Sequence, residues 1–362
     1  MAGRRIAEAG VAASCYFRTS TIGPERKALV QVTERCNLHC AHCFVSARRE
    51  GIDIASEQME RVVLPRLREA RVSRLTLTGG EPFAHPDLVD IARAARGLEM
   101  TVTICTNATL TEHEVLDDLA ALGGVRLNVS LDGFSADSHG KFRGAPASFA
   151  VTRENMRAIG KRGLLKGVLV TPNSLAPLAE YDELCRYAHE CGAEYVLMNP
   201  LSSMGRGVHG IHRLGASEPF MRALAEQTSA FEDDLDIVRI RFPNDDQPLS
   251  GCEAGTIIYV FATGDVTVCP YLVFAARTPQ SRHSDTEFIV GNVFEHPDIA
   301  ARLDGYRLHD RSASAADPTC GTCALADRCG RGCPAAVIAG GGRLGDRDRE
   351  QCPVPDAADE AA

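Results

Sequence analysis

Six short runs rich in β-branched residues alternate with amphipathic helical stretches between residue 27 and about residue 200, and this alternation restricts the folds open to the chain. A further helical pattern begins at Ser56 and has to accommodate Pro65. Strands and helices that alternate in this way form parallel β/α units, which right-handed crossovers arrange into a full or partial barrel. We therefore predict an α/β fold with a partial (β/α)6 TIM-like barrel. The expected strands are residues 28–33, 73–78, 101–105, 125–130, 166–171 and 194–198, and the other expected helices are at about 87–97, 111–121, 146–162 and 177–191.

The sequence changes in character after about residue 236, where the segments become short and rich in turns and seven of the 14 cysteines follow. A length of 362 residues fits two domains, or one large α/β domain with an appendage. We predict a polar N-terminal lead-in at 1–25, a core barrel at 26–235, a small cysteine-rich domain at 236–352 and a flexible acidic tail at 353–362.

The composition excludes several classes of function. A formal net charge of −9 argues against a protein that binds DNA or RNA by neutralising phosphates. No apolar stretch approaches the ~18 to 20 residues of a membrane span, and Glu8 interrupts the apolar run near the N-terminus before it reaches the length of a secretory signal core. We therefore expect a cytoplasmic protein with no nucleic-acid or membrane partner. Thiols stay reduced in that compartment, so the cysteines are expected to be buried apolar residues, metal ligands or catalytic groups.

Three cysteines follow the first expected strand, in the run Cys-Asn-Leu-His-Cys-Ala-His-Cys at residues 36–43. Three thiolates within eight residues can converge on one soft metal centre. A structural zinc site is one alternative, with His39 or His42 as its fourth ligand. A four-iron cluster is the other, and with three cysteines it leaves one iron open to a further ligand. The candidate ligands in both cases are Cys36, Cys40 and Cys43.

The spacing Cys-x3-Cys-x2-Cys, with a ring residue before the last cysteine, resembles the signature of the radical S-adenosylmethionine (SAM) superfamily. Gly79-Gly80-Glu81-Pro82 follows the second expected strand, where this superfamily has its Gly-Gly-Glu-Pro motif. The resemblance implies that these residues hold the amino group of SAM. Physically, the glycines allow close backbone approach, and the Glu81 carboxylate can pair with an ammonium.

Two further stretches are similar to SAM contacts of this superfamily. Ser130-Leu131-Asp132-Gly133 ends the fourth expected strand and Arg143 follows it, in positions where relatives supply a serine and a basic residue near the ribose and carboxylate. Asn107 belongs to a Thr-Asn pair that ends the third strand. The alternative interpretation is a simple turn at Asp132-Gly133 and a solvated charge for Arg143.

The second set of cysteines includes the run Cys-x2-Cys-x5-Cys-x3-Cys, and an expected hairpin at 256–269 carries Gly264-x4-Cys269. Zinc ribbons also use Cys-x2-Cys pairs, but seven cysteines are awkward for tetrahedral zinc sites. The order resembles the SPASM extension, which carries auxiliary iron–sulfur clusters in radical SAM enzymes. By that resemblance, auxiliary [4Fe-4S] cluster I takes Cys252, Cys269 and Cys333, with an open iron or an unidentified fourth ligand. Auxiliary [4Fe-4S] cluster II takes Cys320, Cys323, Cys329 and Cys352.

Four cysteines remain outside these sets. Cys185 and Cys191 lie in and just after an expected helix, where packing explains them, and Cys15 has no assignment. Cys105 shares a strand face with Asn107 near the end of its strand. A thiol there could donate a hydrogen atom to a substrate radical, and a small core residue is the alternative.

The resemblance implies an enzyme that uses a SAM-binding [4Fe-4S] cluster to cleave SAM reductively to a 5′-deoxyadenosyl radical, which abstracts a hydrogen atom from its substrate. The leading hypothesis is maturation of a ribosomally synthesised peptide by cross-linking or related C–H modification. Only 35 residues precede Cys36, so we expect direct docking or a separate precursor-recognition protein. The electron donor is expected to be of the flavodoxin or ferredoxin type. The alternatives are a small-molecule tailoring enzyme that acts on an aminoglycoside, sugar or nucleoside, and a non-catalytic scaffold stabilised by zinc.

Overall fold

A single curved sheet organises the computed structural model, which describes residues 10–18, 21, 23–308, 310 and 318–354. Within these residues the sheet has ten strands in the order β10-β9-β8-β1-β2-β3-β4-β5-β6-β7. Strands β1 to β7 run parallel, β8 pairs in parallel with β1, and β9 and β10 are antiparallel. The strands are β1 (Arg26–Thr33), β2 (Val72–Gly79), β3 (Thr101–Thr106), β4 (Val125–Ser130), β5 (Leu165–Val170), β6 (Tyr195–Met198), β7 (Asp236–Arg239), β8 (Ile257–Val260), β9 (Asp265–Thr267) and β10 (Ile289–Asn292).

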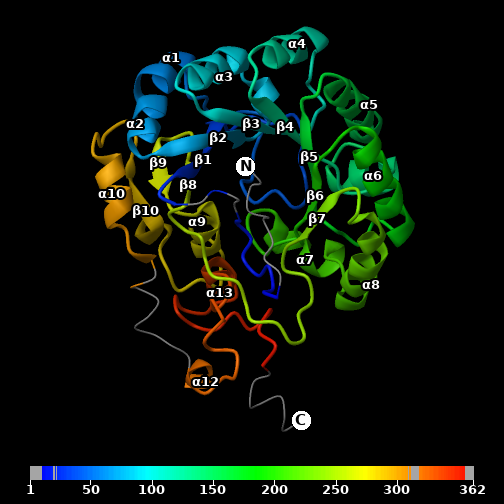
Figure 1. Ribbon diagram of the computed structural model, residues 1–362, viewed down its shortest axis with the longest axis vertical. Helices are drawn as coiled ribbons and strands as arrows, with labels where there is room; N and C mark the ends of the chain where they lie inside the picture. Colours follow the sequence, from blue (N-terminus) through cyan, green and yellow to red (C-terminus); the bar gives the residue numbers. More distant parts are fainter. Residues whose placement is uncertain (1–9, 19–20, 22, 309, 311–317, 355–362) are drawn as a thin grey trace.

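Helices cover the outer face of this curved sheet, as the ribbon shows (Figure 1). The α-helices are α1 (Ser56–Gln58), α2 (Leu64–Glu69), α3 (Leu88–Gly97), α4 (His113–Ala121), α5 (Ser148–Lys161), α6 (Leu178–Glu190), α7 (Gly207–Leu214), α8 (Glu218–Thr228), α9 (Pro270–Ala276), α10 (Ile299–Gly305), α12 (Pro318–Gly321) and α13 (Pro334–Ala339). Short π- or 3₁₀-turns are η1 (Met59–Val63), η2 (Pro82–Ala84), η3 (Ala136–Gly140), η4 (Ser229–Phe231) and η5 (Asp285–Phe288). Each of the helices described here is too short or too polar to cross a lipid bilayer.

The predicted partial barrel is confirmed, and its six strands lie within two residues of their expected bounds. Successive side chains of a strand point to opposite faces. On β1, Ala28, Val30 and Val32 are fully buried under the helices, whereas Lys27 and Leu29 face the interior of the barrel. The strand alternation therefore supplies a packed outer core and an interior, lined by both polar and apolar side chains, that can hold a ligand.

The sheet extends further than the sequence patterns indicate. Strand β7 pairs with β6, and β8 pairs with the opposite edge at β1, so both add to the parallel sheet. Each is only four residues long and lies in the region with short, turn-rich segments. Because β7 begins at Asp236, the sheet crosses the predicted domain boundary at that residue.

The expected helix at Ser56 is divided into α1, the π-turn η1 and α2. Pro65 lies in the first turn of α2. A proline has no N–H to donate and its ring crowds the carbonyl of the preceding turn, so it is tolerated where a helix restarts. The π-turn provides that restart without breaking the helical path.

Residues 12–18 correct the interpretation of the N-terminus as a polar lead-in. Ser14 and Cys15 are buried, and the Ala12 backbone N–H donates to the Pro248 carbonyl at 2.9 Å. This segment therefore packs along the chain that precedes β8, near the C-terminal cysteine-rich region (Figure 1). Of the predicted acidic tail, residues 355–362 lie outside the described residues.

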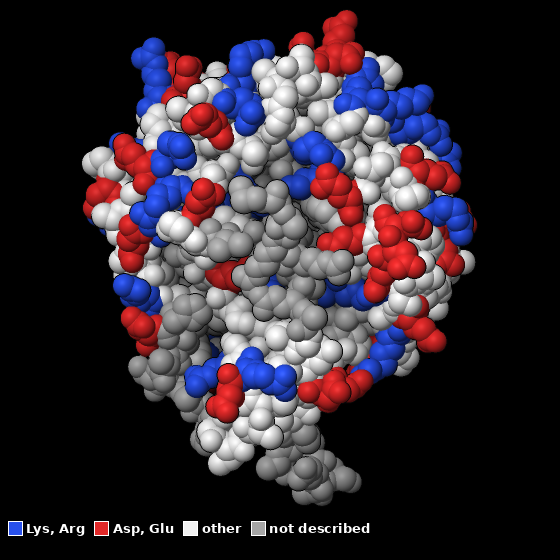
Figure 2. All heavy atoms as spheres, in the orientation of Figure 1, with Lys and Arg blue, Asp and Glu red and all other residues white. Residues whose placement is uncertain are grey.

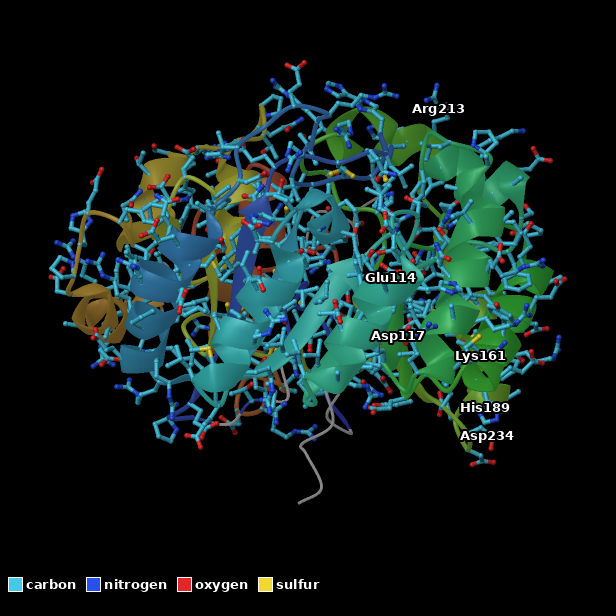
Figure 3. The ribbon with its side chains drawn as sticks, turned by 90° about the horizontal axis from the view of Figure 1, so that it is seen from above. Glu114, Asp117, Lys161, His189, Arg213 and Asp234 are labelled. Carbon is cyan, nitrogen blue, oxygen red and sulfur yellow. The ribbon has the colours of Figure 1, made fainter. Side chains whose placement is uncertain are left out.

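Charged side chains of both signs are mixed over the face of the molecule in Figure 2. The outer helical layer carries many of them, and Figure 3 labels six exposed examples: Glu114, Asp117, Lys161, His189, Arg213 and Asp234. Such exposed groups are hydrated. Polar groups in the barrel interior, by contrast, are held away from water.

A buried ion pair joins the N-terminal segment, β7 and the C-terminal region. The Arg241 guanidinium donates to Asp348 Oδ2 at 2.6 Å and to the Ser14 carbonyl at 2.7 Å. The Cys333 backbone N–H donates to the same Asp348 oxygen at 2.9 Å. Both charged side chains are almost completely buried.

We expect Asp348→Ala to lower the free energy of unfolding by about 3 to 5 kcal/mol, because it leaves the Arg241 charge buried without its main partner. The measurement is urea denaturation of reduced protein under anaerobic conditions. The matched control is Asp346→Ala, two residues away and exposed, which should cost about 1 kcal/mol or less. Equal losses in the two variants would contradict this account of the ion pair.

Candidate functional site

A cavity of about 330 Å³ opens inside the barrel at the C-terminal ends of β1 to β6. In β/α barrels this end of the strands is where binding groups are assembled. Most of the residues predicted for the first cluster and for SAM line this one cavity, together with the predicted hydrogen donor Cys105. They are Cys36, Cys40, Cys43, Gly79, Gly80, Glu81, Cys105, Asn107, Ser130, Asp132 and Arg143. Pro82 is not among the lining residues; it is buried and begins the turn η2.

The loop with the three cysteines is fixed by backbone contacts on both sides. The Ala41 N–H donates to the Phe142 carbonyl at 2.9 Å, and the Arg206 guanidinium donates to the carbonyls of Cys40 at 2.8 Å and Ala47 at 2.7 Å. Burial raises the pKa of the Cys40 thiol to about 12 and also raises the pKa of Cys36. These thiols therefore stay neutral unless a metal centre replaces their protons.

The two histidines of this loop do not complete a zinc site. The His42 ring is buried and stacks on Phe142, with 4.5 Å between ring centroids, and burial lowers its pKa to about 4. The His39 side chain is exposed. Among the described residues, no three histidine, cysteine or acidic side chains are placed to hold a single metal ion. A four-iron cluster is larger than one ion, so its thiolate ligands stand further apart.

Gly79 and Gly80 let the end of β2 lie directly against the loop that follows β1. The Gly80 N–H donates to the Thr33 carbonyl and the Glu81 N–H donates to the Arg35 carbonyl, both at 2.8 Å. A Cβ on Gly79, whose φ is +128°, would overlap the Thr33 oxygen, and a Cβ on Gly80 would overlap the Arg35 oxygen. Only glycine therefore permits this contact.

The Glu81 carboxylate is buried and held by three hydrogen bonds. Oε1 accepts from Thr106 Oγ1 at 2.6 Å and from the Phe83 N–H at 3.1 Å, and Oε2 accepts from the Asn107 N–H at 2.7 Å. A carboxylate has about four acceptor positions, so one remains on Oε2. Burial raises the pKa of Glu81, which a nearby cation would oppose.

Asp132 and Arg143 form a buried ion pair on the opposite wall. Arg143 Nε donates to Asp132 Oδ2 at 2.7 Å, and Asp132 Oδ1 accepts from the Thr171 N–H at 2.8 Å. The Arg143 Nη1 lies 3.9 Å from Cys40 Sγ. The Arg143 cation helps hold the pKa of Asp132 below its usual value despite burial. The Arg143 side chain is therefore buried and paired, and the interpretation as a solvated charge is wrong.

Cys105 faces the same cavity from β3, below Asn107. Its sulfur lies 3.9 Å from Asn128 Nδ2, and Asn128 Oδ1 accepts from the Tyr195 hydroxyl at 2.8 Å. Burial raises the pKa of the Cys105 thiol, which keeps it protonated. Its role as a hydrogen donor stays a prediction.

The Asn107 side chain is largely committed to its own loop. Its amide donates to Asn37 Oδ1 at 3.0 Å, and its oxygen accepts from the Thr109 N–H at 2.8 Å. The backbone N–H of Asn107 is the group that binds Glu81. The Asn107 backbone therefore positions the Glu81 carboxylate, and the predicted contact of Asn107 with SAM stays a prediction.

Several lining residues were not found from sequence. Lys27, Tyr195 and Tyr259 point inward from strands and could have been recognised by period-two alternation, whereas Tyr16 and Tyr271 come from segments that local patterns did not place. Part of the loop at 199–210 also lines the cavity. The loop residues that do so are Asn199, Pro200, Leu201, Ser202 and Arg206.

The second set of cysteines falls into two groups in the structure. Cys320, Cys323, Cys329 and Cys352 all line one separate cavity of about 60 Å³. Cys269 and Cys333 are buried elsewhere and interact electrostatically with each other. None of the 14 cysteines, all of which are described, forms a disulfide.

Lys27, which lines the cavity, makes the free energy of unfolding depend on pH. Burial lowers the pKa of Lys27 to about 8, from 10.5. Between these values the unfolded chain binds a proton that the folded chain has released, so the Lys27 contribution to the free energy of unfolding rises with pH. We expect wild type to gain stability relative to Lys27→Met as pH rises from 8 to 10, measured by urea denaturation. The exposed control Lys161→Met should show a constant difference, and a constant difference for Lys27→Met would refute this burial effect.

Comparisons with known proteins agree with the geometry. Residues 30–192 match the family model described as Radical SAM superfamily. The chain is 26% identical over 269 residues to the antilisterial bacteriocin subtilosin biosynthesis protein AlbA of Bacillus subtilis (strain 168), a match that covers 74% of this chain and 57% of AlbA. It is 27% identical over 337 residues to mycofactocin maturase MftC of Mycobacterium ulcerans (strain Agy99), covering 88% of this chain and 86% of MftC.

Among solved structures, Streptococcus suis SuiB bound to the precursor peptide SuiA matches with a TM-score of 0.71 and 19% identity, over 90% of this chain and 75% of SuiB. This likeness shows a shared fold. The chain spans a little over half the length of AlbA and most of the length of MftC. The part of the chain that matches the radical SAM superfamily, residues 30–192, therefore contains the three-cysteine loop and the Gly-Gly-Glu contact that lie on one cavity.

Proposed function

We propose that this protein is a radical SAM peptide maturase, which binds SAM and a [4Fe-4S] cluster in the barrel cavity and modifies a C–H bond of a ribosomally synthesised peptide. The observation that carries the proposal is the convergence of three thiols, the Glu81 carboxylate and the Arg143 guanidinium on one cavity. The choice of a peptide is supported by the relatives, since AlbA takes part in bacteriocin biosynthesis, MftC is a maturase and SuiB binds a precursor peptide.

The side chains on the cavity wall fit this cofactor. Cys36, Cys40 and Cys43 supply three soft ligands from one loop and leave one iron for SAM. The remaining acceptor position on Glu81 suits the amino group of SAM, and Arg143 offers a cation for its carboxylate. When bound, the cluster and SAM supply hydrogen-atom abstraction from an unactivated C–H bond.

The protein's own residues position these groups and exclude water. Asp132 fixes the Arg143 guanidinium beside Cys40, so that a positive charge already stands near the thiolate ligands. Thr106 and the Asn107 N–H hold Glu81 in place before any ligand arrives. Aromatic rings from Phe44 and Tyr271 line the cavity beside the cysteine loop, and they shield the reacting carbon from water.

The C-terminal region is proposed to carry two auxiliary [4Fe-4S] clusters in a SPASM-like arrangement. The gathering of Cys320, Cys323, Cys329 and Cys352 around one small cavity supports cluster II. Such clusters would accept an electron from a substrate radical and make the reaction a net oxidation. A flavodoxin or ferredoxin as electron donor, and a separate protein that presents the precursor peptide, are further parts of this proposal.

The test of this function is anaerobic co-expression with the short open reading frames encoded beside the gene, followed by mass spectrometry of their products. We expect one peptide to lose about two mass units with wild type and to stay unchanged with Cys36→Ala. An unchanged mass is followed by measurement of deuterium uptake in heavy water, which detects epimerisation. Peptides unchanged by both measurements would contradict a peptide maturase.

Glu81→Gln tests the proposed contact with SAM. The amide keeps the size of the side chain but loses the negative charge that would pair with an ammonium, so we expect SAM to bind at least about tenfold more weakly. Equilibrium dialysis of the reconstituted protein measures the affinity. Glu34→Gln is the control, because Glu34 lies outside the cavity lining and should bind SAM as wild type does. Equal affinities for SAM in wild type and Glu81→Gln would refute the contact.

A further inference from the structure

Cys15 lies beside two cysteines that are far from it in the sequence. Its side chain is 2% exposed, and its thiol interacts with the thiols of both Cys252 and Cys333. The Cys15 sulfur is 3.5 Å from the Gly251 carbonyl and 3.3 Å from the Gly332 carbonyl, the residues that directly precede these two cysteines. Three sulfurs from three distant segments therefore meet in one place, where Cys15 and Cys333 are buried and Cys252 is partly buried.

The backbone around Cys15 is held firmly at this position. The Ser14 N–H donates to Ser250 Oγ at 3.1 Å, and the Ser250 N–H donates to the Ala12 carbonyl at 3.0 Å. On the other side, the Arg241 N–H donates to the Ala13 carbonyl at 2.8 Å. The Arg241 guanidinium also lies over the Tyr16 ring, 4.8 Å from its centroid. These contacts direct the side chain of Cys15 toward Cys252 and Cys333.

Cys269 extends the group to four. Cys269 and Cys333 are both buried and interact electrostatically. Backbone N–H groups already point at their sulfurs, from Tyr16 to Cys333 and from Tyr271 and Leu272 to Cys269. Amide donors around cysteine sulfurs are typical of iron–sulfur centres, where they stabilise thiolate charge.

The other unassigned cysteines have different surroundings. Cys185 is on α6 near Asp182 and Arg239, Cys191 at the end of that helix interacts with Tyr187, and Cys105 faces the barrel cavity. Cys15 is the unassigned cysteine whose thiol contacts two predicted cluster ligands.

We propose that Cys15 is the fourth protein ligand of auxiliary cluster I, together with Cys252, Cys269 and Cys333. The inference rests on the proposed function, because it assumes that this region holds an iron–sulfur cluster. On cluster assembly each thiol gives up its proton and its sulfur binds one iron, so a four-iron cluster would have a cysteine on every iron.

Full ligation has a consequence for the chemistry. A cluster with a cysteine on each iron has no position for a substrate group, so it exchanges electrons with the substrate without binding it. Cys15 also ties this centre to the barrel, because the next residues, Tyr16 and Phe17, line the barrel cavity. The N-terminal segment thus contributes residues to both the proposed auxiliary cluster I and the barrel cavity.

The test isolates the C-terminal clusters by replacing Cys36, Cys40 and Cys43 with alanine in one parent variant. After anaerobic reconstitution the parent should hold about eight irons. Its EPR spectrum after reduction should not change when imidazole is added, because no iron is open. Adding Cys15→Ala should give a spectrum that changes with imidazole, or a loss of up to about four irons per chain. Cys185→Ala, at an equally buried thiol, should behave as the parent does.

Two outcomes overturn the assignment. A parent spectrum that itself responds to imidazole, or a Cys15→Ala variant with the parent's iron content and spectrum, would show that Cys15 is not a ligand. If alanine destabilises the fold, as circular dichroism would reveal, Cys15→Ser keeps the side-chain size and should still alter the spectrum.

Cys252→Ala separates this inference from the proposal on which it rests. A fall to about four irons in Cys252→Ala shows that the cluster exists. If Cys15→Ala then keeps the iron content and EPR spectrum of the parent, only the assignment of Cys15 is overturned. About eight irons in Cys252→Ala, together with an EPR spectrum that does not change with imidazole, would overturn both the auxiliary cluster and the assignment.

Discussion

The site depends on one carboxylate that joins the ends of neighbouring strands. Glu81 follows β2, and its oxygens bind Thr106 and the Asn107 N–H at the end of β3. Its own N–H binds the loop that follows β1, which leads into the three cysteines. A buried carboxylate is costly unless it is hydrogen-bonded, so these contacts form together. The two glycines before Glu81 make the close approach sterically possible, and the cysteine loop is positioned as a result.

Buried ionisable groups inside the barrel are either paired and charged or unpaired and driven toward the neutral form. Asp132 and Arg143 are both buried and remain charged because each compensates the other. Lys27 has no such partner among the groups that shift its pKa, and burial instead drives it toward the neutral form. The cavity therefore presents a fixed ion pair near the cysteines and a lysine whose positive charge is disfavoured by burial.

The sequence was most informative where a pattern is local. The strands β1 to β6 repeat a period-two pattern between amphipathic helices, and the first cysteine motif lies within eight residues, so both could be recognised without knowledge of contacts. Strand β7 could not, because four residues carry too little periodicity. Strand β8 lies in the expected hairpin at 256–269, but its pairing with β1 could not be recognised because that partner is distant in the sequence. Arg143 was identified by resemblance alone, and only the structure shows that Asp132 holds it.

The cysteines of the barrel and those of the C-terminal region are linked by a stack of aromatic rings. Phe44, which follows Cys43, stacks on Tyr271, and Tyr271 stacks on Tyr16, which follows Cys15; both ring separations are 5.1 Å. Because rings in contact resist displacement, the stack fixes the distance between the two groups of sulfurs. The N-terminal segment is thus part of the scaffold that sets the relative placement of the two groups of cysteines. Local sequence patterns could not reveal this, since each ring belongs to a different segment of the chain.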